Sequence, residues 1–335
     1  PLLKAGMERN PSDKRLRLTY ARQLVELGRM DEARGEFSSL LQQFPEDDDL
    51  RFSLALVCLE AEAWREAIVY LEELIQRDAH VDPAQYNLGR AHEALGEVDD
   101  ALLAYSMVGG GTDYLPAQAR MTDLLVANGR SAEASRHLAE ARDSEPEYAL
   151  QLYLIEAESL SKQNKADQAW NLIQQALKQY PGDINLLYTR AMLAEPRGDL
   201  KQLERDLRLI LEREPDNAMA LNALGYTLVD RTDRHQEGLE LIQKAHDLNP
   251  EDPAILDSLG WANYRLGNLA AAEKWLRQAF ERFPDHEVAA HLGEALWAQG
   301  KQREARKIWR DALKEQPESE ILRSTVLRLT GSEKP

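Results

Sequence analysis

Small apolar residues and prolines recur along this chain at a spacing of about 34 residues, which is typical of stacked helical hairpins. The prolines that follow this spacing are Pro11, Pro45, Pro146, Pro181, Pro215, Pro250, Pro284 and Pro317. About ten residues after most of these prolines comes a small residue, as at Ala21, Ala55, Ala191, Gly225 and Gly260. About twelve residues further comes a second one, as at Ala33, Ala67, Ala101, Ala169 and Ala272.

These positions predict how each segment folds. Small side chains at the two recurring places let antiparallel helices approach closely. Proline stops the second helix of each pair. Glycine marks the turn inside the pair, since it adopts the left-handed backbone that ends a helix, at Gly28, Gly96, Gly129, Gly198, Gly267 and Gly300. The pattern predicts full helical pairs that begin near residues 14, 48, 82, 115, 150, 184, 218, 253 and 286.

Two places depart from the repeat. In the sixth pair, Leu203 occupies the second small position and Pro196 interrupts the first helix near its end. In the third pair, the run Gly109–Gly111 should end the second helix early, and we expect a bend or hinge near residues 108–116. The predicted organisation is a partial repeat at 1–13, three pairs at 14–114, six pairs at 115–319, and a capping helix and tail at 320–335.

Over essentially the whole chain, these small, aromatic and proline positions resemble the tetratricopeptide-repeat (TPR) family. The resemblance implies an all-α fold, a right-handed superhelical solenoid of antiparallel helix pairs whose first helices line a concave groove. Function should then be sought on a surface that several pairs form together, because one pair alone builds no pocket. The opening residues LLKAGMERNP look like the end of a second helix, so we expect the chain to be part of a longer array.

Composition narrows the classes of partner. The 335 residues include 58 acids and 41 bases, which gives a net charge of -17. This charge repels phosphate backbones and disfavours nucleic acid, while it favours basic or neutral partners. No apolar run approaches the length of about 20 residues that a membrane-spanning helix needs. The single cysteine, Cys58, excludes an intrachain disulfide and a thiolate metal cluster.

No pattern of catalytic residues occurs. The run Gly109–Gly111 lacks the Gly-Lys-Ser/Thr of a phosphate loop, so we interpret it as a flexible connector. The seven histidines show no pairing at helical spacing, which favours packing or surface roles over metal binding. Cys58 has no nearby histidine and falls at a core position of a first helix. We therefore predict a protein that is not an enzyme and that has no cofactor and no metal site.

The predicted inner surface is the remaining candidate site. Residues 2, 5, 9 and 12 of each pair share one face of its first helix, and in the last pairs this face is rich in aromatic residues. Aromatic side chains among polar neighbours make good anchors for a bound peptide. Alternatively, Trp261 and Trp297 pack between adjacent first helices. The predicted partner-binding residues are Tyr188, Met192, Asn222, Tyr226, Asp257, Trp261, Tyr264 and Trp297.

A narrower resemblance covers about residues 215–320, where the chain reads NALGYTLVDRT and then HQEGLELIQKAHDLNPEDPAILDSLGWANYRLGN. It is similar to a bacterial family of TPR outer-membrane lipoproteins that includes the partner of a periplasmic carboxyl-terminal processing protease. This resemblance implies a noncatalytic adaptor at the periplasmic face of the outer membrane, held by a lipid anchor that this chain does not contain. Such an adaptor binds the protease and promotes degradation of substrates such as peptidoglycan cross-link hydrolases. The alternative is a general envelope-assembly or secretion scaffold that binds peptides without a protease partner.

Overall fold

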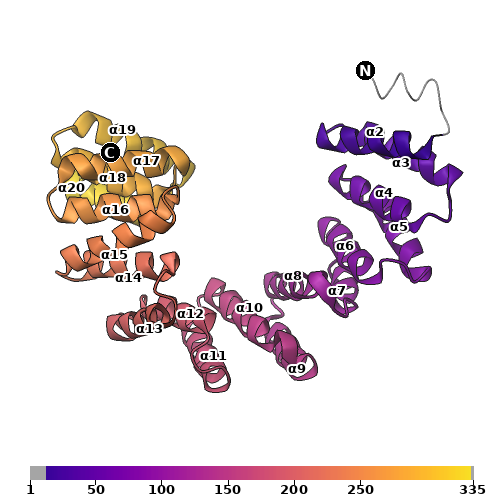
Figure 1. Ribbon diagram of the computed structural model, residues 1–335, viewed down its shortest axis with the longest axis horizontal. Helices are drawn as coiled ribbons and strands as arrows, with labels where there is room; N and C mark the ends of the chain where they lie inside the picture. Colours follow the sequence, from indigo (N-terminus) through magenta and orange to yellow (C-terminus); the bar gives the residue numbers. More distant parts are fainter. Residues whose placement is uncertain (1–12, 333–335) are drawn as a thin grey trace. The chain divides into compact units, whose positions relative to one another are not determined.

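The computed structural model describes residues 13–332, which form helices joined by short turns, with no strand among them (Figure 1). The prediction of an all-α fold built from antiparallel helix pairs is confirmed. The partial repeat predicted at 1–13 lies, except for Asp13, outside the described residues. Among those described, none of the helices combines the length and the apolar composition that crossing a membrane requires.

The chain divides into two compact units, Pro1–Leu172 and Ile173–Pro335, called here the N-terminal and the C-terminal unit. The N-terminal unit contains α2 (Lys14–Glu26), α3 (Met30–Gln43), α4 (Asp48–Glu60), α5 (Trp64–Gln76), α6 (Val81–Ala94), α7 (Val98–Ser106), η1 (Gly111–Asp113), α8 (Tyr114–Ala127), α9 (Ser131–Ser144), η2 (Pro146–Tyr148) and α10 (Ala149–Lys162). The boundary between the units falls within α11 (Ala166–Gln179). The C-terminal unit contains α12 (Ile184–Ala194), α13 (Leu200–Arg213), α14 (Ala218–Arg231), α15 (His235–Leu248), α16 (Pro253–Arg265), α17 (Leu269–Arg282), α18 (His286–Ala298), α19 (Gln302–Glu315) and α20 (Glu320–Thr330).

Local chemistry explains where the first helices begin. Several of them follow an aspartate or asparagine whose side chain accepts a hydrogen bond from a backbone N–H of the first turn, which satisfies a donor that the helix itself leaves unpaired. Such caps are Asp13, Asp47, Asp183, Asn217, Asp252 and Asp285. The described first helices begin within one residue of the positions that the repeat pattern predicts.

The recurring small residues are the places where paired helices touch. Ala21, Ala33 and Ala55 are fully buried. A close approach joins α14 to α15, where a Cβ added to Gly225 would lie 2.7 Å from the carbonyl oxygen of Gly238. A Cβ added to Gly238 would in turn lie 2.5 Å from the carbonyl oxygen of Gly225. Only glycine fits at this crossing.

The two irregular places have local consequences. Helix α7 ends at Ser106, before the glycine run, and the Gly109 N–H donates to Asp82 Oδ1 at 2.9 Å. Helix α12 ends at Ala194, two residues before Pro196. The compact units divide at Leu172 and Ile173, not at the glycine run. A hinge near residues 108–116 and the right-handed superhelix both stay predictions.

Candidate partner-binding site

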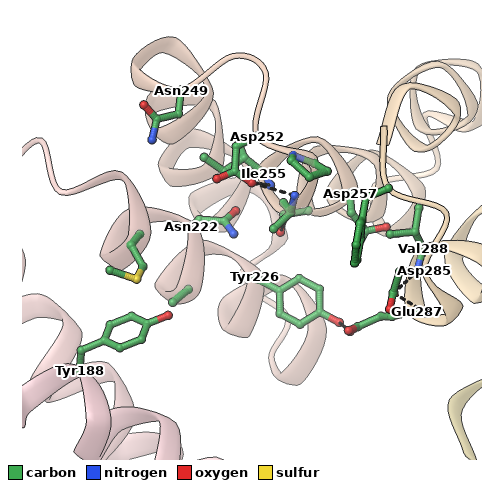
Figure 2. A pocket seen from close by; sticks show the side chains of 16 residues that line it. Tyr188, Asn222, Tyr226, Asn249, Asp252, Ile255, Asp257, Asp285, Glu287 and Val288 are labelled. Atoms are coloured by element: carbon green, nitrogen blue, oxygen red, sulfur yellow. Dashed lines mark hydrogen bonds between the residues drawn. The ribbon is translucent and has the colours of Figure 1, made fainter. Parts of the chain in front are cut away.

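A cavity of about 690 Å³ lies within the C-terminal unit, among the first helices α12, α14, α16 and α18 (Figure 2). We call it the C-terminal cavity. Its volume is in the range of pockets that bind small ligands or a few side chains. Besides the helices, the chain segments that lead into α16 and α18 contribute to its wall, through Asn249, Asp252, Phe283 and Asp285.

Apolar and aromatic side chains form much of the lining. Met219 and Phe283 are 56% and 57% exposed, so each presents a large apolar side chain to solvent. Tyr188 and Tyr226 are half-buried, and burial raises the pKa of both phenols. The Tyr226 hydroxyl is therefore protonated, and it donates to Glu287 Oε1 at 3.2 Å (Figure 2).

Carboxylates give the lining its charge. Among the described residues, the lining includes Asp252, Asp257, Asp285 and Glu287 but no lysine, arginine or histidine. Asp252 Oδ1 accepts from the Ala254 N–H at 2.9 Å, and Asp285 Oδ1 accepts from the Glu287 N–H at 2.8 Å. Both aspartates cap helices, and the helix dipole stabilises their negative charge in this place.

Asn222 adds an unpaired acceptor. Its side chain comes from α14 and lines the cavity (Figure 2). The Oδ1 atom is buried and has no hydrogen-bond partner among the described residues. A buried acceptor without a partner costs about 1–3 kcal/mol, so a bound molecule that donates a hydrogen bond here would recover that loss.

A layer of rings and charges supports the wall from behind. His291 Nδ1 lies 2.9 Å from Asp257 Oδ2, and both side chains are buried. Burial alone would lower the pKa of His291, but the charge and hydrogen bond of Asp257 raise it overall. The His291 ring stacks on Trp261 with centroids 4.2 Å apart, and it lies 6.3 Å from the Tyr226 ring. These contacts join α14, α16 and α18.

The structure brings together half of the predicted partner-binding residues. Tyr188, Asn222, Tyr226 and Asp257 line the C-terminal cavity, whereas Met192 does not. Whether any of these residues contacts a partner stays a prediction.

Trp261 is only 7% exposed, and its Nε1 donates to Asp230 Oδ1 at 3.0 Å. It packs between adjacent first helices, the alternative that the sequence left open. The Tyr264 hydroxyl donates to Glu294 Oε1 at 2.9 Å. The Trp297 ring lies 5.7 Å from the ring of Trp309. Trp261 therefore offers little surface to a ligand.

Sequence reasoning missed Phe283, Asp252 and Asp285, because they precede helices and do not share the helical face that was counted. Phe283 had one signal, a large apolar residue directly before the repeat's Pro284. Its exposure depends on how α17 ends and on the path of the chain into α18. Neither follows from the repeat pattern.

Two candidate reactive groups elsewhere have simpler explanations. His92, Glu97 and Asp100 place ligand atoms within 4.8 Å of one another, but Glu97 already pairs with Arg65 and with His92 Nδ1. Cys58 is buried, and burial raises the pKa of its thiol to about 12. A thiol in this state is a poor nucleophile.

Comparisons with known proteins agree with the repeat pattern. Tetratricopeptide-repeat sequence profiles match residues 1–57, 58–110, 120–184, 232–287 and 291–319. A TPR repeat-containing protein of Pseudomonas aeruginosa is 64% identical over the whole chain, which spans 57% of that protein's length. The bacteriophage adsorption protein A of Escherichia coli is 36% identical over 28% of this chain and 9% of its own length. The crystal structure of the APC/C hetero-tetramer Cut9–Hcn1 is similar in fold, with a TM-score of 0.53 at 16% identity, over 97% of this chain and 57% of that one.

Proposed function

This chain belongs to the tetratricopeptide-repeat family, and we propose that it is a noncatalytic adaptor that holds other proteins by their extended segments. TPR arrays are protein-interaction scaffolds, in which stacked repeats create surfaces that a single repeat lacks. The observation that carries the proposal is the C-terminal cavity. It combines exposed apolar side chains with an unpaired acceptor on Asn222, and an extended peptide offers both apolar side chains and backbone N–H donors.

The finer proposal concerns the partners. We propose a periplasmic carboxyl-terminal processing protease and its substrates, such as peptidoglycan cross-link hydrolases, at the periplasmic face of the outer membrane. The resemblance of residues 215–320 to TPR outer-membrane lipoproteins supports it, and most of the cavity lining falls in this stretch. Holding protease and substrate on one array raises their effective concentration toward each other.

Capture of partners from a native extract tests the role of the cavity. The full chain is compared with a Tyr188→Ala/Met219→Ala variant, which removes an aromatic and an apolar contact from the lining. The matched control is Leu103→Ala, because Leu103 is 63% exposed on α7 in the other unit. We expect the double variant to capture less protease and less substrate, while the control is unchanged. Equal capture by all three chains removes the cavity from the proposal.

Degradation of a candidate substrate by purified protease, with and without this chain, tests the finer proposal. We expect faster degradation when the chain is present. An unchanged rate contradicts the protease partner and favours the general envelope scaffold. Turnover of any substrate by the purified chain alone contradicts the noncatalytic assignment.

A further inference from the structure

The charges around the C-terminal cavity are poorly balanced within the described part of the chain. Asp257 has the buried His291 as a partner, and Asp285 Oδ2 lies 3.2 Å from His286. Neither Asp252 nor Glu287 forms an ion pair with a described basic residue.

Glu287 is the carboxylate most open to a ligand. It is exposed in the first turn of α18, and the hydrogen bond that it accepts comes from the neutral hydroxyl of Tyr226. A neutral donor orients the carboxylate but leaves its charge in place. A cation that enters the cavity would meet this charge beside the Tyr226 hydroxyl.

Apolar surface lies next to these charges. Met219 and Phe283 line the same cavity and are each more than half exposed. A ligand that offered only charge would leave both side chains in water, and a wholly apolar ligand would desolvate carboxylates without pairing them, which is costly. A ligand that carries both a cation and an apolar group satisfies both parts of the lining.

From this lining we propose that the C-terminal cavity selects a partner segment in which a lysine or arginine lies next to a large apolar side chain. The basic group pairs with Glu287, apolar side chains beside it pack on Phe283 and on Met219, and a backbone N–H of the segment donates to Asn222 Oδ1. The proposal rests on the proposed function, because it names the class of segment that the adaptor binds. Acidic or phosphorylated segments are disfavoured, since the described residues of the lining include no lysine or arginine to receive them.

Binding of short synthetic peptides to the full chain tests this selection. The probe is a fluorescent peptide Gly-Ser-Phe-Arg-Phe-Ser-Gly with blocked ends, measured by fluorescence polarisation. Three matched peptides replace arginine by glutamine, replace arginine by glutamate, or replace both phenylalanines by alanine. We expect each replacement to weaken binding, with glutamate worst, by about tenfold or more relative to arginine, because one partly desolvated ion pair is lost and repulsion is added.

Variants of the protein locate the pairing. Glu287→Gln keeps the size of the side chain. We expect this substitution to lower the affinity for the arginine peptide about tenfold and to leave the affinity for the glutamine peptide unchanged. Glu315→Gln is the control, because Glu315 is also exposed but lies at the end of α19, outside the lining. Added salt should weaken binding of the arginine peptide more than binding of the glutamine peptide.

The inference is overturned if the arginine peptide does not bind, or if the glutamate peptide binds as tightly as the arginine peptide. It is also overturned if Glu287→Gln lowers the affinity for the arginine and glutamine peptides equally. Its failure is distinguishable from failure of the proposed function. Suppose that no peptide binds but capture of protein partners still depends on Tyr188 and Met219. The proposed adaptor function is then supported, and the proposed selection of a basic segment is contradicted. If the arginine peptide binds as expected but capture is unaffected by those substitutions, the proposed selection of a basic segment is supported. The proposed role of the cavity in capturing protein partners is then contradicted.

Discussion

The two units each contain a histidine that joins a carboxylate and an aromatic ring of the preceding repeat. In the N-terminal unit, His80 lies 2.9 Å from Asp49 and stacks on Phe52 at 4.8 Å. In the C-terminal unit, His291 lies 2.9 Å from Asp257 and stacks on Trp261 at 4.2 Å. The contacts match, but the surroundings do not.

Burial separates the two arrangements. The His80 and Asp49 side chains are 34% and 89% exposed, whereas those of His291 and Asp257 are 5% and 9% exposed. Water screens the first pair, and exposed pairs contribute about 0–1 kcal/mol. The second pair is desolvated, so that losing one partner leaves a charge that water cannot reach. The same residue types therefore form a surface contact in one unit and a fixed wall behind a cavity in the other.

Replacing His291 should have the largest effect. His291→Ala leaves the buried Asp257 carboxylate without its partner and removes the ring that supports Trp261 and Tyr226. We expect a loss of about 3–5 kcal/mol from the free energy of unfolding of the C-terminal unit. Urea denaturation gives the size of the loss, and hydrogen exchange locates it, with less protection in α16 and α18 and no change in α4. A loss below about 1 kcal/mol would mean that burial does not make His291 contribute more to stability than His80.

Replacing Gly225 should have the next largest effect, because the buried wall requires α14 to lie close to α15. In Gly225→Ala the added methyl meets the Gly238 carbonyl and the Ile242 side chain, and we expect a loss of about 1–3 kcal/mol. Gly35→Ala in α3 is the control, since a Cβ there would meet no atom of the described residues within 4 Å. Thermal unfolding should show the control to be unchanged or slightly more stable, because alanine favours the helix. Equal losses in both variants would show that backbone contact at Gly225 is unimportant.

The fold could be predicted from sequence because its signals are local. Small residues, turn glycines and prolines act within one helical pair, and the pairs repeat. The inner face was partly predictable for the same reason, since helical spacing places Tyr226 and Asp257 on it. Trp261 holds the same register as Tyr226 but is buried, because α18 brings His291 against its ring. That contact depends on two repeats at once, and no pattern within one repeat encodes it.

The stability that His291 contributes to the C-terminal unit should depend on pH, and this effect ranks third in size. The pKa of His291 is raised in the folded protein, so its contribution to stability is fully present below the unfolded value of about 6.5. That contribution is lost as pH rises through the folded pKa. We expect the stability difference between the wild type and His291→Gln to shrink as pH rises above about 6.5. Urea denaturation of both chains from pH 5.5 to 9 measures it, and a difference that grows with pH would contradict the assignment.

Replacing His80 should have the smallest effect, although its contacts resemble those of His291. In His80→Ala, Asp49 remains solvated, and the exposed pair is worth about 0–1 kcal/mol. Part of even this loss should vanish in about 1 M salt, where the Debye length falls to about 3 Å and weakens the attraction between exposed charges. Urea denaturation of the variant and the wild type at low and high salt measures the loss of stability and the part of that loss that salt removes. A loss as large as that of His291→Ala would show that stacking on an aromatic ring, and not burial of the ion pair, determines what such a histidine contributes. The wall behind the C-terminal cavity would then owe its stability to Trp261 and not to Asp257.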